Sequence, residues 1–313
     1  MTDVIFRPLA EGEFELFDSY ATPPVSGVGE RHKPFLQMAQ EGEYRHDWLW
    51  VALRGDELVA RAAFWGPPGS EHAFSLDLLD FQSVEVGAEL LKAAYAELVT
   101  PGYDTPSGAR PDFHLFLPAD WRERPDSLAD ANVRVEAAEK AGLEFHVERL
   151  NLRWDASHGL PERSTRLRFE PVTDDEALIE VLTEIVEGSL DAGDQVELLT
   201  HTPREVAADT LKVVAEMPGG RDRFRLGYNE AGDLVGAVLP TRNSRFATTG
   251  YIGVSPRHRG HGYAFDLLAE SMHIFAAEGE TVITDNTDVG NVPMAAIFDR
   301  IGYRITGRRM IFR

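Results

Sequence analysis

The stretch SPRHRGHGYAFDLL, residues 255–268, gathers cationic side chains and two glycines immediately before an apolar run. The preceding TTGYIGV (248–254) has the composition of a strand, and the apolar spacing after Gly262 predicts a helix that ends at Gly279. A helix start offers free N–H groups and a positive dipole end, and glycines let a phosphate approach the backbone. The stretch therefore predicts a pyrophosphate-binding turn, with added positive charge from Arg257, His258, Arg259 and His261.

Three phosphate-binding patterns compete for this turn. The P-loop pattern G-x-x-x-x-G-K-[ST] is absent. A dinucleotide fingerprint requires a third glycine where this chain has Phe265, although Asp285 stands near the place of its ribose-binding acid. The third pattern, R-x-x-G-x-G, is present and follows a strand that ends in V-x-P (Val254 and Pro256).

The third pattern, together with NVPMAAIFDRIGY at residues 291–303, resembles the GCN5-related N-acetyltransferases (GNAT). The close resemblance covers roughly residues 166–313. The chain as a whole is similar to tandem members of that family, which include mycothiol synthase. The resemblance implies an α+β fold with two tandem GNAT-like domains, each a mixed, mostly antiparallel sheet flanked by helices.

The resemblance also implies acetyl-CoA as co-substrate and transfer of its acetyl group to a primary amine by direct attack. The pyrophosphate would bind backbone amides from about Arg259 to Ala264, and the pantetheine arm would lie where the strand ending near Val254 splays from TVITDN. The backbone N–H of Val254 would stabilise the oxyanion. The expected cofactor-binding residues are Ile252, Gly253, Val254, Arg257, His258, Arg259, Gly260, His261, Gly262, Tyr263, Ala264, Asn286, Asn291 and Phe298.

Acceptor and proton-transfer residues follow from the same resemblance. The acidic loop EGSLDAGDQVELL (187–199) would border the acceptor, so Asp191, Asp194 and Glu197 are candidates to bind an ammonium group. Glu197 and Asp285 are candidate bases, which would need a raised pKa. Many family members protonate the leaving thiolate with a tyrosine at the position of Phe298, which has no proton to give; the general acid is therefore left open.

The elements that would position these residues occur twice along the chain. A strand and helix begin at Phe6 and again at Phe169, hairpins are expected over 48–65 and 223–240, and each half closes with a helix, a glycine (Gly142, Gly302) and a strand. We expect domains at 1–154 and 165–313, joined by a linker at 155–164. The segment 23–35 is expected to be a long loop, and the C-terminal RRMIFR an edge strand.

The first domain is expected to be a degenerate, accessory copy. Its region matching the turn, residues 76–95, has one glycine, no arginine, and acids at Asp77, Asp80 and Glu85 that would repel a pyrophosphate.

Composition limits the partners. The net charge of -21 argues against nucleic acid and suits a cationic substrate, and no apolar run is long enough to span a membrane. The N-terminus shows no signal pattern, which favours the cytoplasm. His258 and His261 lack further ligands, so no metal is expected.

Three alternative functions stay open: a non-catalytic acyl-CoA sensor or scaffold, a protein or peptide N-acetyltransferase, and acetylation of an amino-sugar conjugate. The oligomeric state is not predicted.

Overall fold

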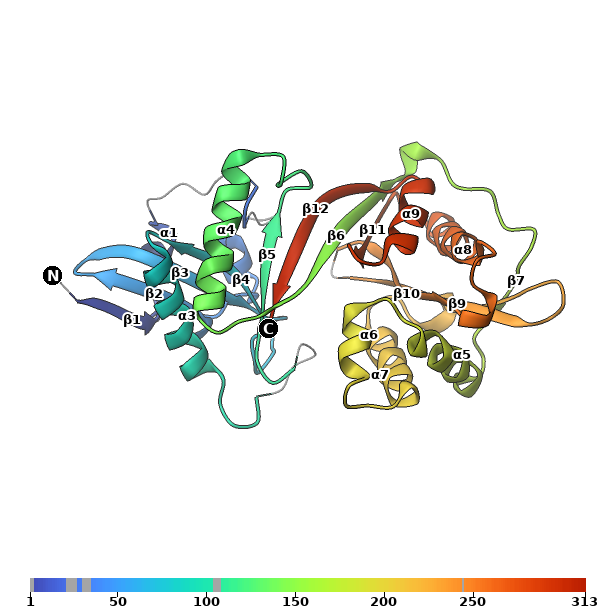
Figure 1. Ribbon diagram of the computed structural model, residues 1–313, viewed down its shortest axis with the longest axis horizontal. Coiled ribbons are helices and arrows are strands. Elements are labelled where there is room, and N and C mark those ends of the chain that lie inside the picture. Colours follow the sequence, from blue (N-terminus) through green and yellow to red (C-terminus); the bar gives the residue numbers. More distant parts are fainter. Residues whose placement is uncertain (1–2, 21–26, 30–34, 104–107, 244) are drawn as a thin grey trace. The chain divides into compact units, whose positions relative to one another are not determined.

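The chain forms two units, each containing neighbouring strands and the helices that flank them (Figure 1). The computed structural model describes residues 3–20, 27–29, 35–103, 108–243 and 245–313. The first unit comprises Met1–Arg149 and Gly307–Arg313, and the second comprises Leu150–Thr306. The strands β6 (Phe145–Asp155) and β12 (Arg304–Phe312) therefore contribute residues to both units.

In the first unit the strand order is β1-β2-β3-β4-β5-β12-β6. The strands besides β6 and β12 are β1 (Val4–Pro8), β2 (Leu49–Arg54), β3 (Glu57–Trp65), β4 (Ser75–Phe81) and β5 (Asp112–Leu117). The helices are α1 (Phe14–Asp18), α2 (Phe35–Gln40), α3 (Val84–Leu98) and α4 (Pro125–Lys140). Apolar side chains of α3 and α4 pack in one core cluster, and those of α1 and α2 in another.

In the second unit the strand order is β12-β6-β11-β10-β9-β8-β7. The new strands are β7 (Arg168–Pro171), β8 (Arg225–Tyr228), β9 (Leu234–Arg242), β10 (Ala247–Val254) and β11 (Val282–Asp288). The helices are α5 (Asp175–Glu187), α6 (Ala192–Glu197), α7 (Pro203–Glu216), α8 (Tyr263–Ala277) and α9 (Val292–Arg300). Figure 1 shows α8 and α9 on one side of the sheet and α5, α6 and α7 on the other, and separate clusters of buried side chains lie on the two sides.

The order of elements repeats between the two units. In each, one strand is followed by helices, then by three antiparallel strands, a helix, a strand, a helix and a closing strand. The predicted hairpins are β2–β3 and β8–β9, and the helix-ending glycines Gly142, Gly279 and Gly302 all have positive φ. The predicted α+β class and tandem arrangement are therefore confirmed, with mixed, mostly antiparallel sheets flanked by helices.

Two sequence expectations differ from the structure. The C-terminal RRMIFR is not an edge strand, because residues Arg308–Phe312 of β12 pair antiparallel with β5 and bury Phe312 in the core of the first unit. The unit boundary follows from this pairing: it falls at Arg149, and the last seven residues, 307–313, join the first unit. The expected linker, 155–164, lies within the second unit, where it connects β6 to β7. Most of the expected loop at 23–35 lies outside the described residues.

Candidate functional site

The strands β10 and β11 separate along their length. β10 pairs with β9 from Ala247 to Val254, but its recorded pairing with β11 among the described residues is limited to Ala247↔Ile283. Both strands run in the same direction, so the gap between them opens from this pair toward Val254 and Asp288. We call this gap the β10–β11 wedge.

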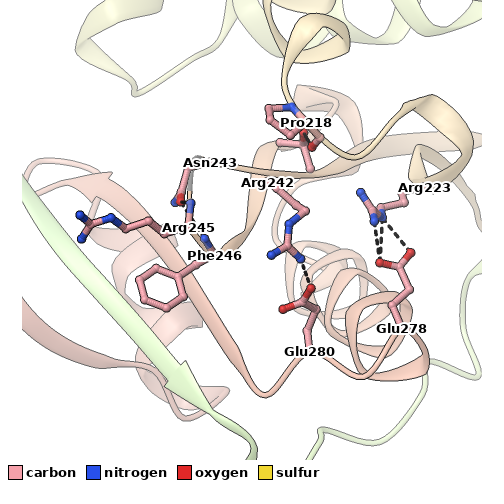
Figure 2. Close-up of polar contacts among 9 residues, drawn as sticks. Pro218, Arg223, Arg242, Asn243, Arg245, Phe246, Glu278 and Glu280 are labelled. Atoms are coloured by element: carbon pink, nitrogen blue, oxygen red, sulfur yellow. Dashed lines mark hydrogen bonds and ion pairs between the residues drawn. The ribbon is translucent and has the colours of Figure 1, made fainter. Parts of the chain in front are cut away.

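The closed end of the wedge is tied by the turn that joins β9 to β10. The side-chain Oδ1 of Asn243 accepts hydrogen bonds from the backbone N–H groups of Arg245 and Phe246, at 2.9 and 2.8 Å. Its Nδ2 donates to Thr284 Oγ1 of β11 at 3.1 Å. Figure 2 shows Arg242, on the adjoining end of β9, paired with Glu280 just before β11. These contacts fix the two strands to each other where the wedge begins.

Asp285 lies just inside the wedge and is buried. Its Oδ1 accepts hydrogen bonds from Thr249 N–H at 2.7 Å and Thr248 Oγ1 at 3.1 Å, and its Oδ2 accepts from Thr249 Oγ1 at 3.0 Å and Tyr303 Oη at 2.8 Å. Burial raises the pKa of the Asp285 carboxyl to about 6 despite these four donors. The carboxyl is therefore occupied by its neighbours, which argues against its sequence-based role as a catalytic base.

The open end of β10 presents a backbone donor to the wedge. Ser255 N–H donates to Val235 C=O at 2.9 Å, which places that N–H on the β9 edge. Because successive N–H groups of a strand point to opposite edges, the N–H of Val254 points to the β11 edge, where β11 has separated. Ile252 and Gly253 precede it on the same strand, and a Cβ at Gly253 would lie 2.3 Å from Ile185 of α5.

The predicted anion-binding turn links β10 to α8. It contains a single 3-10 turn, Pro256–His258, followed by Gly260 and Gly262 with φ of 83° and 79°. Within the described residues, no group accepts a hydrogen bond from the backbone N–H groups of residues 260–264. A Cβ at Gly260 would meet open space, so the turn has room beside its backbone. Consecutive free N–H groups at the start of a helix suit a phosphate, and the residues present therefore fit the predicted ligand.

The arginines of the turn are exposed, and both contact other parts of the second unit. Arg257 is paired with Glu184 of α5. Arg259 donates to Val254 C=O at 3.2 Å and to Gly188 C=O at 2.8 Å. Both were expected to supply positive charge to a phosphate. In this structure their guanidinium groups instead bind the turn to β10 and to the C-terminal end of α5. His258 is half-buried and His261 is exposed.

Sequence reasoning missed Arg166, which precedes β7. Its Nη1 donates to the C=O of His261 at 2.7 Å, its Nη2 pairs with buried Asp266 in the first turn of α8, and its guanidinium lies 5.5 Å from the Tyr263 ring centroid. Arg166 lies roughly 90 residues before the turn in sequence, so no local pattern predicted this contact.

The acidic segment 187–199 folds against β10 and β11. Asp191 caps α6, accepting from Gly193 N–H at 2.8 Å. Asp194 is buried and accepts from Ser189 Oγ at 2.6 Å and from Tyr251 Oη at 3.1 Å. Asp288, at the end of β11, accepts from Ala192 N–H at 2.7 Å, and so fixes α6 beside the open end of the wedge.

Tyr251 is a second residue that sequence reasoning missed. Burial, followed by the negative charge of Asp194, raises its pKa well above the usual value, which keeps the phenol protonated. Glu197, at the end of α6, is exposed and lies 3.4 Å from His201 Nδ1. Of the three predicted acceptor acids it is the one whose side chain is open to solvent.

The residues expected on α9 and β11 are divided between surface and core. Asn286 is exposed on β11, and Asn291 caps α9 by accepting from Met294 N–H at 3.3 Å. Phe298 is only 2% exposed and packs edge-on against Tyr303, with the ring centroids 4.9 Å apart. Phe298 is thus a core residue of the second unit in this structure, which speaks against its expected place beside the cofactor.

The first unit has the same strand separation but not the same turn. β4 and β5 are in register only at Ser75↔Asp112 and Leu76↔Phe113 among the described residues. Gln82 and Ser83 alone separate β4 from α3, and the Ser83 hydroxyl caps that helix by accepting from Val86 N–H at 3.4 Å. The long glycine-containing turn of the second unit therefore has no counterpart here.

Residues 28 and 29 narrow the gap between β4 and β5. Val28 is 1% exposed, and Gly29 N–H donates to Phe116 C=O of β5 at 2.8 Å. These two residues line a cavity of about 60 Å³ together with residues of β4 and β5, Arg61 and Arg134. A space of this size holds a few water molecules.

The acids that were expected to repel a phosphate in the first unit are mostly buried and paired. Asp80 contacts Arg61 at 2.9 Å and Arg134 at 3.2 Å, and Asp77 accepts from Ser75 Oγ at 2.7 Å. Glu85 is exposed and lies 3.2 Å from Lys140. Asp77 and Asp80 therefore hold the unit together around the narrowed gap.

Comparisons with known proteins agree with the fold. Residues 197–303 match the Acetyltransferase (GNAT) family model. A GCN5-related N-acetyltransferase from Sphaerobacter thermophilus is similar with a TM-score of 0.58 and 14% identity, covering 99% of this chain and 94% of that one. A tandem GNAT protein from the clavulanic acid biosynthesis pathway is similar with a TM-score of 0.50 and 17% identity, covering 99% and 98%. No curated protein matches the chain in sequence.

Two further findings concern membranes and metal ions. In the described parts of the chain, no helix has the length and apolar character needed to cross a bilayer. Over the same residues, no group of three or more His, Cys, Asp or Glu side chains is placed to hold a metal ion.

Proposed function

We propose that the chain is a GNAT acetyltransferase, as the match of residues 197–303 to that family's model supports, and that its second unit transfers an acetyl group from acetyl-CoA to a primary amine of a small molecule. The observation that carries the proposal is the joined arrangement of a glycine turn with free N–H groups and the β10–β11 wedge. The turn suits a pyrophosphate and the wedge suits an extended arm, so one ligand with both parts fits the site.

The proposed binding residues are those expected from the sequence, except that Phe298 is left out and that Arg257 and Arg259 change role. The N–H groups of residues 260–264 would hold the pyrophosphate, while Arg257 and Arg259 would act by fastening the turn. Ile252, Gly253 and Val254 would border the pantetheine arm, and Asn286 of β11 and Asn291 at the start of α9 would face it from the other side. Acetyl-CoA supplies the activated thioester, and the Val254 N–H would donate to its carbonyl oxygen as negative charge develops there.

The proposed acceptor is a cation, because acids surround α6. The side chains of Asp191 and Asp194 hold α6 in place, so these two carboxylates would attract the cation electrostatically without contacting it. The exposed Glu197 would contact the ammonium group or accept its proton. The occupied Asp285 carboxyl and the buried Phe298 leave proton transfer to Glu197 or to water. An acceptor amine must lose a proton before it attacks, so turnover should rise with pH as the amine is neutralised.

We also propose that the first unit is accessory. Val28 and Gly29 narrow the gap that corresponds to the wedge to a cavity of about 60 Å³, and the connection before α3 is too short to form a phosphate-binding turn. Acetyl-CoA would therefore bind once per chain.

Calorimetric titration with acetyl-CoA tests this function, followed by thiol release in the presence of a panel of small amines. The informative variant is Gly260→Asp, and the matched control is Gly279→Asp at the far end of α8. Both glycines are exposed, have φ of 83° and 85°, and have open space beside them, so the backbone cost is similar. We expect Gly260→Asp to abolish binding and Gly279→Asp to leave it unchanged. Equal affinity in both variants would overturn the assignment of the turn.

A non-catalytic acyl-CoA sensor is the second candidate, because the two side chains at the expected acid and base positions, Phe298 and Asp285, are both taken up by the protein itself. Binding of acetyl-CoA without thiol release for any amine would favour this candidate, and amine-dependent thiol release would exclude it.

A further inference from the structure

The carboxyl of Asp285 occupies the angle at which β10 and β11 separate. The last registered pair is Ala247↔Ile283, and Asp285 and Thr249 each stand two residues beyond it on their strands. In a regular parallel ladder, the Thr249 N–H would be satisfied by a main-chain carbonyl of the neighbouring strand. Here it donates to Asp285 Oδ1 at 2.7 Å, so a side chain replaces the main-chain partner.

The same carboxyl accepts hydrogen bonds from β10 and from the residue that precedes β12. Thr248 and Thr249 reach it from β10 with their hydroxyls, Asp285 itself belongs to β11, and Tyr303 immediately precedes β12. Each carboxylate oxygen accepts two hydrogen bonds, which uses its ordinary capacity. A carboxylate with four hydrogen-bond donors fixes the positions of those donors. It has no free lone pair with which to abstract a proton from a substrate.

We propose that Asp285 is a positioning residue: it fixes the point and direction in which β10 leaves β11, and thereby the placement of the Val254 N–H against the acyl group. The proposal rests on the acetyl-CoA function of the second unit given above.

The length of β10 makes this placement sensitive. Val254 is the fifth residue after Thr249, which at about 3.3 Å per residue places it roughly 16 Å away. A swing of about 5° at Thr249 would move the Val254 N–H by about 1.4 Å. A displacement of about 1 Å at the reacting atoms can cost on the order of 100-fold in rate. One buried carboxylate at the closed end can therefore govern the chemistry at the open end.

Asparagine at position 285 should preserve the hydrogen bonds that Asp285 makes, because of how the donors are divided between its two carboxylate oxygens. The backbone N–H of Thr249 and the hydroxyl of Thr248 both address Oδ1, which asparagine retains. The two groups at Oδ2 are hydroxyls, Thr249 Oγ1 and Tyr303 Oη, and both can turn to accept from an amide Nδ2. Among the described residues, Tyr303 is the ionisable partner of this carboxyl, and burial raises its pKa well above the usual value, so it stays protonated.

The test uses two ligands and four variants of the full chain. Acetyl-CoA would engage both the turn and the wedge, whereas 3′-phosphoadenosine 5′-diphosphate keeps the pyrophosphate and lacks the pantetheine arm. The variants are Asp285→Ala, Asp285→Asn, Tyr303→Phe, and the control Asp112→Asn. Asp112 is a buried aspartate at the corresponding strand separation of the first unit, and burial raises its pKa too.

We expect Asp285→Ala to weaken acetyl-CoA binding at least 10-fold, Tyr303→Phe to weaken it about threefold, and Asp285→Asn and Asp112→Asn to change it less than twofold. 3′-Phosphoadenosine 5′-diphosphate should bind all four variants within twofold of the unaltered protein. If Asp285→Ala does not fold, Tyr303→Phe and Asp285→Asn carry the test. For any amine that is turned over, Asp285→Asn should keep kcat within about threefold.

Several results would overturn the proposal. A loss of about 100-fold or more in kcat for Asp285→Asn, with acetyl-CoA binding intact, would make Asp285 the catalytic base. Equal weakening of both ligands would make its role one of general stability, and an unchanged acetyl-CoA affinity in Asp285→Ala and Tyr303→Phe would remove the role altogether. Failure of the unaltered protein to bind acetyl-CoA would be a failure of the proposed function instead.

Discussion

Replacing Asp285 by asparagine should change how the stability of the second unit depends on pH. Burial raises the pKa of this carboxyl from 3.8 to about 6. Between about pH 4 and 6 the folded protein therefore holds a proton that the unfolded chain has released, and the free energy of unfolding falls as the pH rises through this interval. The contribution is fully present below pH 4 and is lost above pH 6. Asparagine carries no such proton, so the variant lacks this dependence.

The linkage relation gives the magnitude. For pKa values of 3.8 unfolded and about 6 folded, the stability of the unaltered protein relative to Asp285→Asn should fall by about 2 kcal/mol between pH 4.5 and pH 7.5. Urea unfolding of both proteins, followed by far-UV circular dichroism at several pH values, measures this difference. Comparing the two proteins cancels the titration of the many other acids. A difference that stays constant within about 0.5 kcal/mol, or that changes in the opposite direction, would refute the reasoning.

Three further substitutions probe the site. Arg259→Ala leaves the carbonyls of Val254 and Gly188 without their guanidinium donor, so the acetyl-CoA dissociation constant should rise about 10-fold by calorimetry; no change would show that the turn holds without it. Phe298→Tyr places a hydroxyl in the core, which should cost about 1–3 kcal/mol in urea unfolding and leave thiol release no faster; faster release would return position 298 to the active site. Val28→Asp buries a carboxyl in the first unit and should cost about 3 kcal/mol or more, while acetyl-CoA still binds once per chain; an unaltered melting temperature would show that Val28 does not narrow the gap.

Local patterns in the sequence were sufficient to predict the repeated elements and the turn. Glycines such as Gly260, Gly262 and Gly302 take the left-handed φ for which glycine is suited, and apolar periodicity marks α8. These signals depend on residues close together in the chain, so they can be recognised without the fold.

Features that depend on distant contacts could not be predicted in the same way. The sequence pattern of RRMIFR is that of any alternating strand, and only the fold reveals that β5 pairs with it. Nothing near Asp285 indicates that Thr249 and Tyr303 will fill its oxygens, and Val28 was hidden in a segment that resembles a plain loop. Candidate bases chosen by residue type alone are therefore the least secure predictions, since a buried carboxylate can serve as a structural acceptor.

The central claim, that the turn and wedge of the second unit bind acetyl-CoA, is tested most directly by calorimetric titration of the unaltered chain and of Gly262→Asp. Gly262 has a φ of 79° and is the N-cap of α8, and a Cβ there would lie 3.5 Å from Arg166 Nη2, so Gly262→Asp would strain the backbone and place a negative charge in the turn proposed to hold the pyrophosphate. The account predicts one acetyl-CoA per chain in the unaltered protein and none in Gly262→Asp. Two molecules per chain, or equal binding in the variant, would contradict it.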